Sequence, residues 1–433
     1  MIAMQGDRLT HGLWESTAPP APPAPPLRDR IEVDVAVIGA GFTGLSAALH
    51  LAGAGRSVAV LEAAEIGFGA SGRNVGLVNA GMWVLPDALP QRLGTTHGER
   101  LLRLLGDAPS LVFELVARHG MACEAVRHGT LHCAVGASGL ATLRTRAEQW
   151  QRLGAPVRLL DRDETAARVG TTAYAGALLD RRAGTLQPLA YARGLARAAL
   201  GAGARLHGGS AVVGAQDLGG AWRLAIAGGG QVDARWVIVA TNTYSLPAGP
   251  WSSLAIELVR MPYFNLATRP LPGDLRRAIL PGGEGAWDTR TILSSLRLDA
   301  AGRLVFGSIG ALRPPGHAVH RDWGRRALRR LFPALRDTAF EHEWYGWIGM
   351  TSDALPRFHQ PARHVASFSG YNGRGIGTGT VFGRELARLV LGEIGAADLA
   401  LPERSIVPAP WRGAREAFYE AGAQLAHLVG ARG

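Results

Sequence analysis

The sequence predicts an α/β fold, α+β overall, in which a second domain is inserted into a doubly wound domain. Three observations support this prediction. An apolar, β-branched run at Val33–Ile38 leads into a glycine-rich turn and a helical pattern. Later strand-like and helix-like segments are mixed, with no internal repeat. The chain has 433 residues, which is long enough for two or three domains.

The first predicted element is a βαβ unit. Val33–Ile38 has the composition of a buried parallel strand, and Gly39 ends it. Ser57–Leu61 has the composition of a second strand. Between the two strands, apolar residues recur at i, i+3, i+4 and i+7, the spacing of one helix face, at Leu45, Ala48, Leu49 and Ala52.

The remaining elements are less regular, and the domains predicted from them are discontinuous. Helices are expected at Leu101–Leu105, Leu111–Val116, Leu140–Leu153 and Leu189–Leu200, and strands at Trp236–Val239 and Leu304–Phe306. We expect a Pro-rich arm at 1–30, a cofactor domain at 31–85, 185–255 and 340–400, an inserted substrate domain at 86–184 and 256–339, and a C-terminal tail at 401–433.

The arm contains the sequence APPAPPAPP at Ala18–Pro26, which favours a polyproline II conformation. Two interpretations remain open. The segment is either a strap on the domain surface, anchored by Leu13, Trp14 and Leu27, or a binding motif for a partner. Because the βαβ unit begins only at Ile31, we expect removal of residues 1–26 to leave cofactor binding largely intact.

Composition excludes several functions. All 46 basic residues are Arg, so no side-chain amine can serve as a base or form a Schiff base. The net charge is +11, but the Arg residues are scattered, so nucleic-acid binding is not predicted. Two cysteines, Cys123 and Cys133, form no CxxC pair, and no secretory signal or transmembrane segment is evident. A cytoplasmic location is expected.

The clearest motif is GAGFTG, which opens the predicted helix at Gly39, Gly41, Phe42, Thr43 and Gly44. Its glycines permit a tight turn, close approach of a pyrophosphate to the backbone, and close packing of helix on strand. Glu62, followed by Ala63, ends the second strand 23 positions after Gly39, where a carboxylate can accept hydrogen bonds from a ribose. The unit is therefore Rossmann-like, and the carboxylate disfavours NADP.

Two loops of small residues fit a long, flat cofactor. The first includes Gly69, Ala70, Ser71, Gly72, Arg73, Asn74, Val75 and Gly76. The second includes Gly370, Tyr371, Asn372, Gly373, Arg374, Gly375, Ile376 and Gly377, and leads into a helix. A helix N-terminus at the second loop would favour negative charge on a bound ring.

These motifs resemble the D-amino-acid oxidase and glycine oxidase superfamily of FAD enzymes, and in particular its gamma-glutamylputrescine oxidoreductase branch. The resemblance rests on the GAGFTG, GASGRN and GYNGRG motifs, the strand ending at Ala240, Thr241 and Asn242, and the Asp288-Thr289-Arg290 segment. It implies FAD, a doubly wound Rossmann-like domain, a substrate domain containing an antiparallel sheet, and oxidation of a carbon–nitrogen bond to an imine. It also implies FAD contacts at Val212, Val213 and Gly349.

The chain departs from the monomeric sarcosine oxidase branch in ways that bear on the cofactor. Gly346 stands where that branch has a flavin-linked Cys, and no His lies in Gly67–Gly81, so non-covalent FAD is expected. The two Lys residues that the branch uses toward oxygen and toward the substrate carboxylate are missing, with Gly377 near the place of the second. The choice between oxygen and another compound as the electron acceptor is therefore left open by the sequence.

Substrate-side candidates are Arg73, Tyr263, Arg290, Arg297 and Arg374, with Trp287 as a further aromatic. Each has an ordinary structural alternative, since an Arg in a turn often bonds loop carbonyls and spaced aromatics often belong to the core. The histidine pairs lack a carboxylate pattern for metal binding, so no metal is expected.

The predicted function is FAD-dependent oxidation of an amine or amino acid by hydride transfer to flavin. A small-molecule substrate and an electron acceptor are the expected partners. Two alternatives remain open, namely an FAD-dependent monooxygenase and a flavin-loaded interaction protein without turnover.

Overall fold

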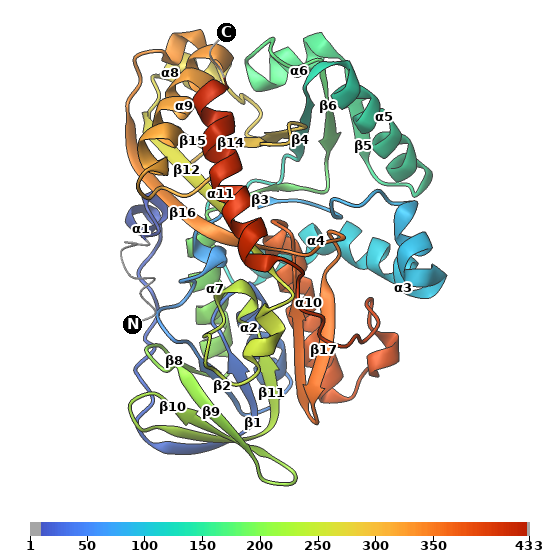
Figure 1. Cartoon of the computed structure of the whole chain (residues 1–433), viewed down its shortest axis with the longest axis vertical. Coiled ribbons are helices and arrows are strands. Elements are labelled where there is room, and N and C mark those ends of the chain that lie inside the picture. The colour runs from blue at the N-terminus through green and yellow to red at the C-terminus, as the bar shows by residue number, and fades with distance from the viewer. Residues whose placement is uncertain (1–9, 431–433) are drawn as a thin grey trace.

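The computed structural model describes residues 10–430, so residues 1–9 of the Pro-rich arm lie outside the described part of the chain. Two eight-stranded sheets form the core of the fold, and helices cover them (Figure 1). A short two-stranded sheet lies between them, formed by β3 (Leu77–Val78) and β7 (Gly184–Thr185). The predicted α/β class with a second, largely antiparallel sheet is confirmed.

The first sheet has the strand order β17-β18-β11-β1-β2-β8, and β10 and β9 extend from β11. β1 pairs in parallel with both β11 and β2, and β2 pairs in parallel with β8. The carboxyl ends of these central strands therefore lie at one edge of the sheet. The strands are β1 (Arg30–Ile38), β2 (Val58–Leu61), β8 (Arg205–His207), β9 (Val212–Asp217), β10 (Trp222–Ile226), β11 (Gln231–Val239), β17 (Arg357–Ala362) and β18 (Val365–Ser369).

Helices from distant parts of the chain pack on the first sheet. α2 (Phe42–Gly53) packs against both α7 (Pro188–Gly201) and α10 (Gly375–Leu391), and α10 also contacts α4 (Ala108–Arg118). At Gly383 an added Cβ would clash with the carbonyl of Thr43, so this glycine allows α10 to approach α2 closely. The sequence predicted α2, α7 and part of α4, and these elements are confirmed.

The second sheet has the order β16-β12-β15-β14-β13-β4-β6-β5 and is antiparallel except where β13 meets β4. Its strands are β4 (Thr130–Ala134), β5 (Val157–Leu160), β6 (Gly176–Asp180), β12 (Val259–Pro270), β13 (Gly285–Asp288), β14 (Ser294–Leu298), β15 (Arg303–Ile309) and β16 (Phe340–Met350). The other helices are α1 (Leu13–Thr17), α3 (Ala88–Gly106), α5 (Gly136–Arg152), α6 (Arg162–Val169), α8 (Gly273–Ala278), α9 (Gly316–Leu331) and α11 (Arg412–Val429).

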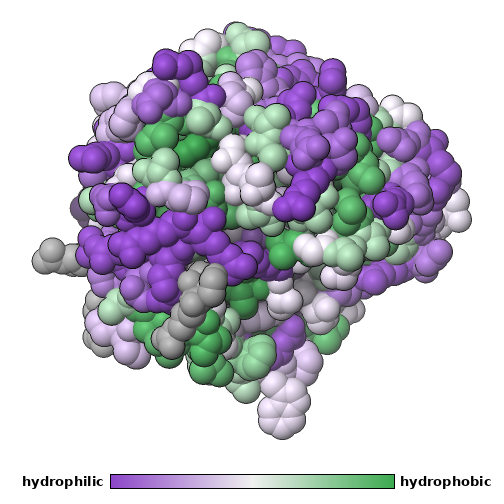
Figure 2. All heavy atoms as spheres, turned by 90° about the horizontal axis from the view of Figure 1, so that it is seen from above, coloured by the Kyte–Doolittle hydropathy of each residue, from purple (hydrophilic) through white to green (hydrophobic). Residues whose placement is uncertain are grey.

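Seen from above, the end of the molecule formed by the second sheet and its helices has a mixed surface (Figure 2). Hydrophilic side chains cover much of it, with separate apolar patches between them. Within residues 10–430, none of the helices combines the length and the apolar character needed to cross a bilayer.

Two segments differ from the expected domain organisation. Residues 340–350 were placed in the cofactor domain, but they form β16, which pairs with β12 along the edge of the second sheet. The expected C-terminal tail contains α11, which packs on β12 and α9. Both differences reflect long-range packing that local sequence patterns do not report. The arm from Thr10 onward packs on the protein with Leu13, Trp14 and Leu27 buried, which agrees with the strap interpretation.

Candidate active site

A cavity of about 860 Å³ lies between the two sheets. It runs from the carboxyl ends of β1, β2 and β11 to the inner strands of the second sheet, and its walls also include the loop before α10 and one side of α11. Ligand sites in open α/β sheets lie at this end of the strands. The position is therefore the one expected for a cofactor with a substrate beside it.

The GAGFTG motif forms the turn between β1 and α2. Gly39 has φ of +105°, which favours glycine, and an added Cβ at Gly44 would clash with the carbonyl of Gly39. At Gly41 an added Cβ would lie 2.9 Å from Oγ of Ser71. Gly41 is the N-cap of α2 and has no side chain to cover the helix start, and Gly41, Phe42 and Thr43 line the cavity. This geometry fits a pyrophosphate held by backbone N–H groups.

Glu62 follows β2 and joins the neighbouring turns. Its Oε2 accepts a hydrogen bond from the N–H of Ala40 at 2.8 Å, and its Oε1 accepts one from Ala64 at 2.9 Å. Burial raises the pKa of the Glu62 carboxyl, and the bonds from backbone N–H groups oppose that rise. The carboxylate lines the cavity and has lone pairs to spare, as the ribose role requires.

The GASGRN loop is held together by its own asparagine. Nδ2 of Asn74 donates to the carbonyls of Ala70 and Ser71, each at 3.0 Å, and its Oδ1 accepts the N–H of Gly76 at 2.9 Å. Oγ of Ser71 accepts the N–H of Phe42 at 3.1 Å. The loop is therefore fastened to the start of α2 and forms one side of the cavity.

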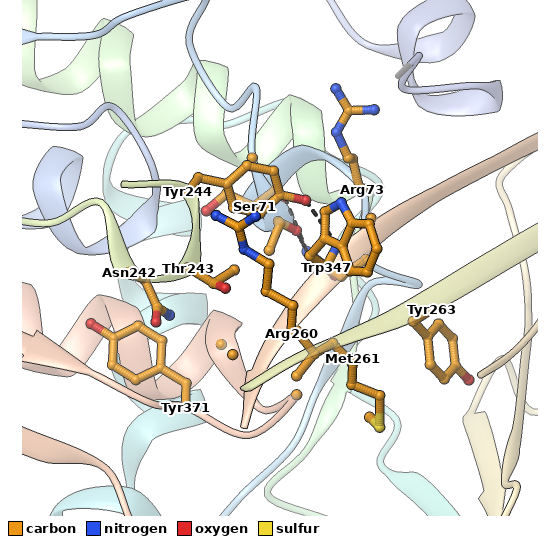
Figure 3. A pocket seen from close by; sticks show the side chains of 18 of the residues that line it. Ser71, Arg73, Asn242, Thr243, Tyr244, Arg260, Met261, Tyr263, Trp347 and Tyr371 are labelled. Carbon is orange, nitrogen blue, oxygen red and sulfur yellow. Dashed lines mark hydrogen bonds between the residues drawn. The ribbon is translucent and has the colours of Figure 1, made fainter. Parts of the chain in front are cut away.

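Arg73 holds this loop in place. Its Nε donates to the carbonyl of Phe68 at 2.7 Å, its Nη1 donates to the carbonyl of Thr10, and its guanidinium stacks on the Phe68 ring. The residue is 2% exposed, and Figure 3 shows its guanidinium turned away from Arg260, with its Cβ end nearest the cavity. The structure therefore places its charge on loop carbonyls, the structural alternative given above for an Arg in a turn.

The second glycine-rich loop lies across the cavity from the first. The hydroxyl of Tyr371 lies 2.8 Å from Oγ1 of Thr43, and Oδ1 of Asn372 accepts the N–H of Thr351 at 2.8 Å. α10 begins directly after Arg374, which makes no side-chain cap, and Gly375 and Ile376 line the cavity. The helix dipole therefore places positive potential at the cavity wall.

Strands of the second sheet form the substrate side. The hydroxyl of Tyr263 lies 2.7 Å from Oγ of Ser295, and both residues line the cavity with Trp287. Figure 3 shows Arg260, Met261 and Tyr263 on the same strand, β12, beside Trp347. We call this substrate side of the cavity the chamber, and its wall is mostly aromatic and apolar.

Arg374 is a buried cation between two aromatic rings. Its guanidinium carbon lies 4.9 Å from the ring centroid of Trp83 and 5.5 Å from that of Trp287, and its Nη1 donates to the carbonyl of Ala80 at 2.9 Å. Burial, followed by the nearby charge of Arg146, lowers its pKa to about 9. Arg374 is therefore still protonated at neutral pH, and it lines the cavity.

The prediction for Arg297 differs from its observed position. Arg297 does not line the cavity, although Ser295 on the same strand does. Its guanidinium donates to the carbonyl of Leu186, lies 3.5 Å from Oε2 of Glu124, and stacks on Trp14. Side chains two positions apart on a strand point the same way but are separated by about 7 Å. Arg297 therefore extends beyond the chamber and anchors the arm.

The other predicted residues divide in the same way. Most of the predicted cofactor residues line the cavity. Others stand behind its wall, where an added Cβ would meet protein atoms, or lie elsewhere: Gly44, Gly72, Gly76, Val213, Gly370 and Gly377. Val213 is 51% exposed on β9, because its neighbour Val212 takes the inward position of that strand.

Sequence reasoning missed several wall residues. The hydroxyl of Tyr244 accepts the N–H of Trp347 at 2.8 Å and closes one side of the cavity. Arg260, Phe418 and Tyr419 also line it. Tyr244 lies two residues after Asn242, a predicted site residue, so its position in the sequence could have indicated it. No local sequence pattern indicates the other three.

The charges on the cavity wall are unbalanced. Among the described residues that line it, four carry guanidinium groups, namely Arg73, Arg260, Arg290 and Arg374, and Glu62 carries the single carboxylate. Glu62 lies at the β2 end, away from the second sheet. Nε of Arg260 is buried without a hydrogen-bond partner among residues 10–430, and Arg290 lies 3.9 Å from the Asp288 carboxylate. The substrate side therefore favours an anionic group.

No Cys or His of residues 10–430 lines the cavity. Cys123 and Cys133 are buried free thiols elsewhere. One group in the same part of the chain, His11, Glu15 and Glu65, comes close enough to share an ion. Its members already have protein partners, since Nε2 of His11 lies 3.2 Å from the carbonyl of Gly67 and Glu15 pairs with Arg193. The absence of a metal stays a prediction.

Comparison with known proteins identifies related chains. The family model described as DAO, FAD dependent oxidoreductase, matches residues 34–389. Gamma-glutamylputrescine oxidoreductase of Escherichia coli (strain K12) is 34% identical over 371 residues, which are 85% of each chain. Probable oxidoreductase OrdL of Rhizobium meliloti (strain 1021) is 31% identical over 388 residues, 89% of each chain. The crystal structure of glycine oxidase from Geobacillus kaustophilus has a TM-score of 0.70 at 21% identity and covers 86% of this chain and all of that one.

Proposed function

Because this chain belongs to the DAO family of FAD-dependent oxidoreductases, we propose that it oxidises a carbon–nitrogen bond of an amine or amino acid whose substrate form also carries a carboxylate. One observation carries the carboxylate part of the proposal. The chamber beside the GASGRN and GYNGRG loops, here called the flavin-cradling loops, is lined by Arg260, Arg290 and Arg374, while the one carboxylate on the described cavity wall is Glu62, at the cofactor end.

The chain's own residues fit the cofactor. The turn at Gly39 and Gly41 and the open end of α2 suit the pyrophosphate, and Glu62 suits a ribose. The GASGRN and GYNGRG loops then flank the remaining length of the cavity. FAD, when bound, supplies a ring that accepts a hydride from the substrate. Since no described Cys or His lines the cavity, we propose that FAD is held without a covalent bond.

The cations have two roles in this proposal. A guanidinium from Arg290 or Arg260 binds and orients the substrate carboxylate, for which a planar fork of N–H donors is well suited. The same positive potential disfavours an ammonium group nearby and so lowers the pKa of the substrate amine. The neutral amine is the form that can be oxidised, so the site promotes the reactive form without a lysine.

The surrounding side chains limit which amines fit. A polyamine would place a second ammonium among guanidinium groups and find no carboxylate partner on the described substrate-side wall. The E. coli relative is named for gamma-glutamylputrescine, a compound that has a carboxylate as well as amines. An amine that carries a carboxylate therefore agrees with the compound in the relative's name and with the positive charge of this cavity wall.

Two finer parts of the proposal concern the surroundings of the enzyme. Cys123 and Cys133 are both free and buried, which supports a reducing, cytoplasmic compartment. Electrons leave the flavin to oxygen or another acceptor. The partners of the protein are small molecules and not nucleic acid, because the Arg residues are scattered along the chain.

The decisive experiment is anaerobic titration of the holoprotein with matched pairs of compounds. Each amino acid, in both enantiomers, is paired with the amine left when its carboxylate is removed, and flavin bleaching is followed by absorbance. We expect members of the amino-acid set to reduce the flavin, each with a lower Kd than its paired amine. If no compound bleaches the flavin, C–N oxidation is refuted. If the amines bind better, the carboxylate assignment alone is wrong.

A variant pair tests the cations. Arg290→Gln should raise the Kd of the amino acid more than that of its paired amine, by about tenfold or more, because a hydrogen bond to a charged group contributes about 1.5–3 kcal/mol. Arg330→Gln replaces an exposed Arg on α9 away from the cavity and should change neither Kd. Equal weakening of amine and amino acid by Arg290→Gln would contradict the assigned role.

A further inference from the structure

One side of α11 forms part of the cavity wall. The lining residues on this helix are Phe418, Tyr419, Gly422 and Ala423. They recur at i, i+1, i+4 and i+5, so they make one continuous stripe along the helix. In Figure 1 the helix crosses the front of the molecule from the second sheet toward the first. α11 therefore faces the chamber rather than only the surface.

The stripe runs from solvent into the protein. Phe418 is 71% exposed and Ala423 is fully buried, although both line the same cavity. The aromatic ring of Phe418 thus stands at the mouth of the chamber, and Ala423 at its inner wall. A substrate entering from this side passes the helix before it reaches the flavin-cradling loops.

An ion pair and a hydrogen bond hold the helix against neighbouring segments of the chamber. Nε and Nη2 of Arg313 donate to the two carboxylate oxygens of Glu420 at 2.9 and 2.6 Å, a bidentate arrangement. Oε1 of Glu416 accepts the backbone N–H of Arg260 at 3.0 Å. Since β12 also supplies Met261 and Tyr263 to the chamber, the second contact fixes α11 beside the strand that forms the adjoining wall.

The C-terminal end of the helix is held as well. Nδ1 of His427 lies 2.8 Å from Nδ1 of His320, and its ring stacks on Trp323 with centroids 4.0 Å apart. Nη2 of Arg326 donates to the carbonyl of His427 at 2.6 Å. With both its middle and its end bound, α11 is a fixed wall.

This wall lies outside the residues that the family model matches. That match ends at residue 389, and α11 begins at Arg412. The shape of the chamber on this side is therefore set by residues that the family match does not include.

We propose that α11 determines the substrate size that this enzyme accepts, and that the substrate carries an apolar or aromatic group that packs against Phe418, Tyr419 and Ala423. The proposal rests on the proposed function, because it extends the chamber described there. The carboxylate and amine lie toward the guanidinium groups, and the apolar group lies toward the helix. Phe418 and Gly422 are specificity-determining positions.

Gly422 provides the sharpest test. An added Cβ there meets a single neighbour, the Phe418 ring at 4.0 Å, so a larger side chain projects into the cavity without a backbone clash. Leucine also favours a helix over glycine. Gly413 on the same helix is exposed, away from the cavity, and has no atom within 4 Å of an added Cβ. Gly413→Leu is therefore a matched control for Gly422→Leu.

Binding is measured separately from turnover. The probes are acetate, benzoate and 2-naphthoate, which share a carboxylate and increase in size, and each is titrated against oxidised holoprotein by the change in the flavin spectrum. In parallel, alanine and phenylalanine are tested as flavin reductants. The ratio of FAD to protein shows that the fold and cofactor site are intact.

We expect Gly422→Leu to weaken 2-naphthoate about tenfold or more and acetate less than about twofold, since overpacking a site costs about 1–3 kcal/mol. Gly413→Leu should leave the binding of all three probes unchanged, and Phe418→Ala should weaken binding of the largest probe relative to the smallest, because it removes a ring against which the apolar group packs. Uniform weakening, or no change with FAD content intact, would overturn the proposal.

The outcomes separate the two proposals. Size-dependent carboxylate binding without flavin reduction by any amine would support the wall and refute the proposed reaction. Flavin reduction with a size profile that neither variant changes would keep the reaction and refute the wall. If Gly422→Leu does not fold, Phe418→Ala decides, because that ring is mostly in solvent and its removal should not unfold the chain.

Discussion

Replacement of Trp14 by alanine should destabilise the protein and its FAD site together. Trp14 lies in the Pro-rich arm, is fully buried, and packs edge-to-face on Trp344 with ring centroids 5.3 Å apart. Its Nε1 donates to the carbonyl of Asn74 at 2.9 Å, so the arm holds the last residue of the GASGRN loop. Its own carbonyl accepts a bond from Nε2 of Gln187.

The magnitude follows from burial. Truncation of a buried Trp to Ala costs about 3–5 kcal/mol, a large share of the roughly 5–15 kcal/mol that stabilises a typical domain. The cost is transmitted to the cofactor site because Arg73, in the same loop, donates to the carbonyl of Thr10 in the arm. Trp14→Ala should therefore lose FAD more readily, and removal of residues 1–26 should lose more.

Urea unfolding and the FAD-to-protein ratio after gel filtration measure both effects. Trp411→Ala is the matched control, because Trp411 is 83% exposed and its loss should change the free energy of unfolding by less than about 0.5 kcal/mol. A change below about 1 kcal/mol for Trp14→Ala, with full FAD retention, would refute the reasoning. It would also restore the expectation from sequence that the arm is dispensable.

Four further outcomes are expected. Glu62→Gln should weaken FAD binding by about 1–3 kcal/mol, which fluorescence titration of the apoprotein measures, and unchanged affinity would remove the ribose role. Acid precipitation should release FAD into the supernatant, whereas flavin in the pellet would show a covalent bond. Reduced flavin should react slowly with oxygen and faster with a quinone dye, because the chain has no Lys, and stopped-flow mixing with air-saturated buffer tests this. Burial lowers the pKa of His427 to about 3 and that of His320 to about 4. The unfolded chain then binds more protons below about pH 6.5, so the free energy of unfolding should fall between pH 6.5 and 4, and His427→Asn should reduce that slope.

The cofactor half of the site was readable from the sequence because its signals are local. Gly39, Gly41 and Glu62 belong to one βαβ unit of about thirty residues, and the role of each depends mainly on contacts with nearby residues. Strand and helix positions in that unit follow from periodicity alone, and the structure confirms them.

The substrate half was less readable because its geometry depends on pairing between distant segments. Residues 340–350 were assigned to the cofactor domain, since no local pattern shows that Tyr345 pairs with Phe264 in the second sheet. Arg297 is a residue type suited to a substrate pocket, yet its guanidinium lies against Trp14, which is far away in the sequence. α11 was called a tail because its role depends on the chamber that it faces.

The arm also sets the order in which the protein can mature during synthesis. Trp14 and the loop that it secures leave the ribosome early, but the other contacts of the arm come from Gln187, Val305 and Trp344, far later in the chain. β1 likewise waits for β11 before it has a neighbour on that side. The packing of the arm that secures the GASGRN loop is therefore incomplete until more than three quarters of the polypeptide has emerged. FAD should enter a nearly finished chain, and a translation arrest before Trp344 should yield a product that does not retain it.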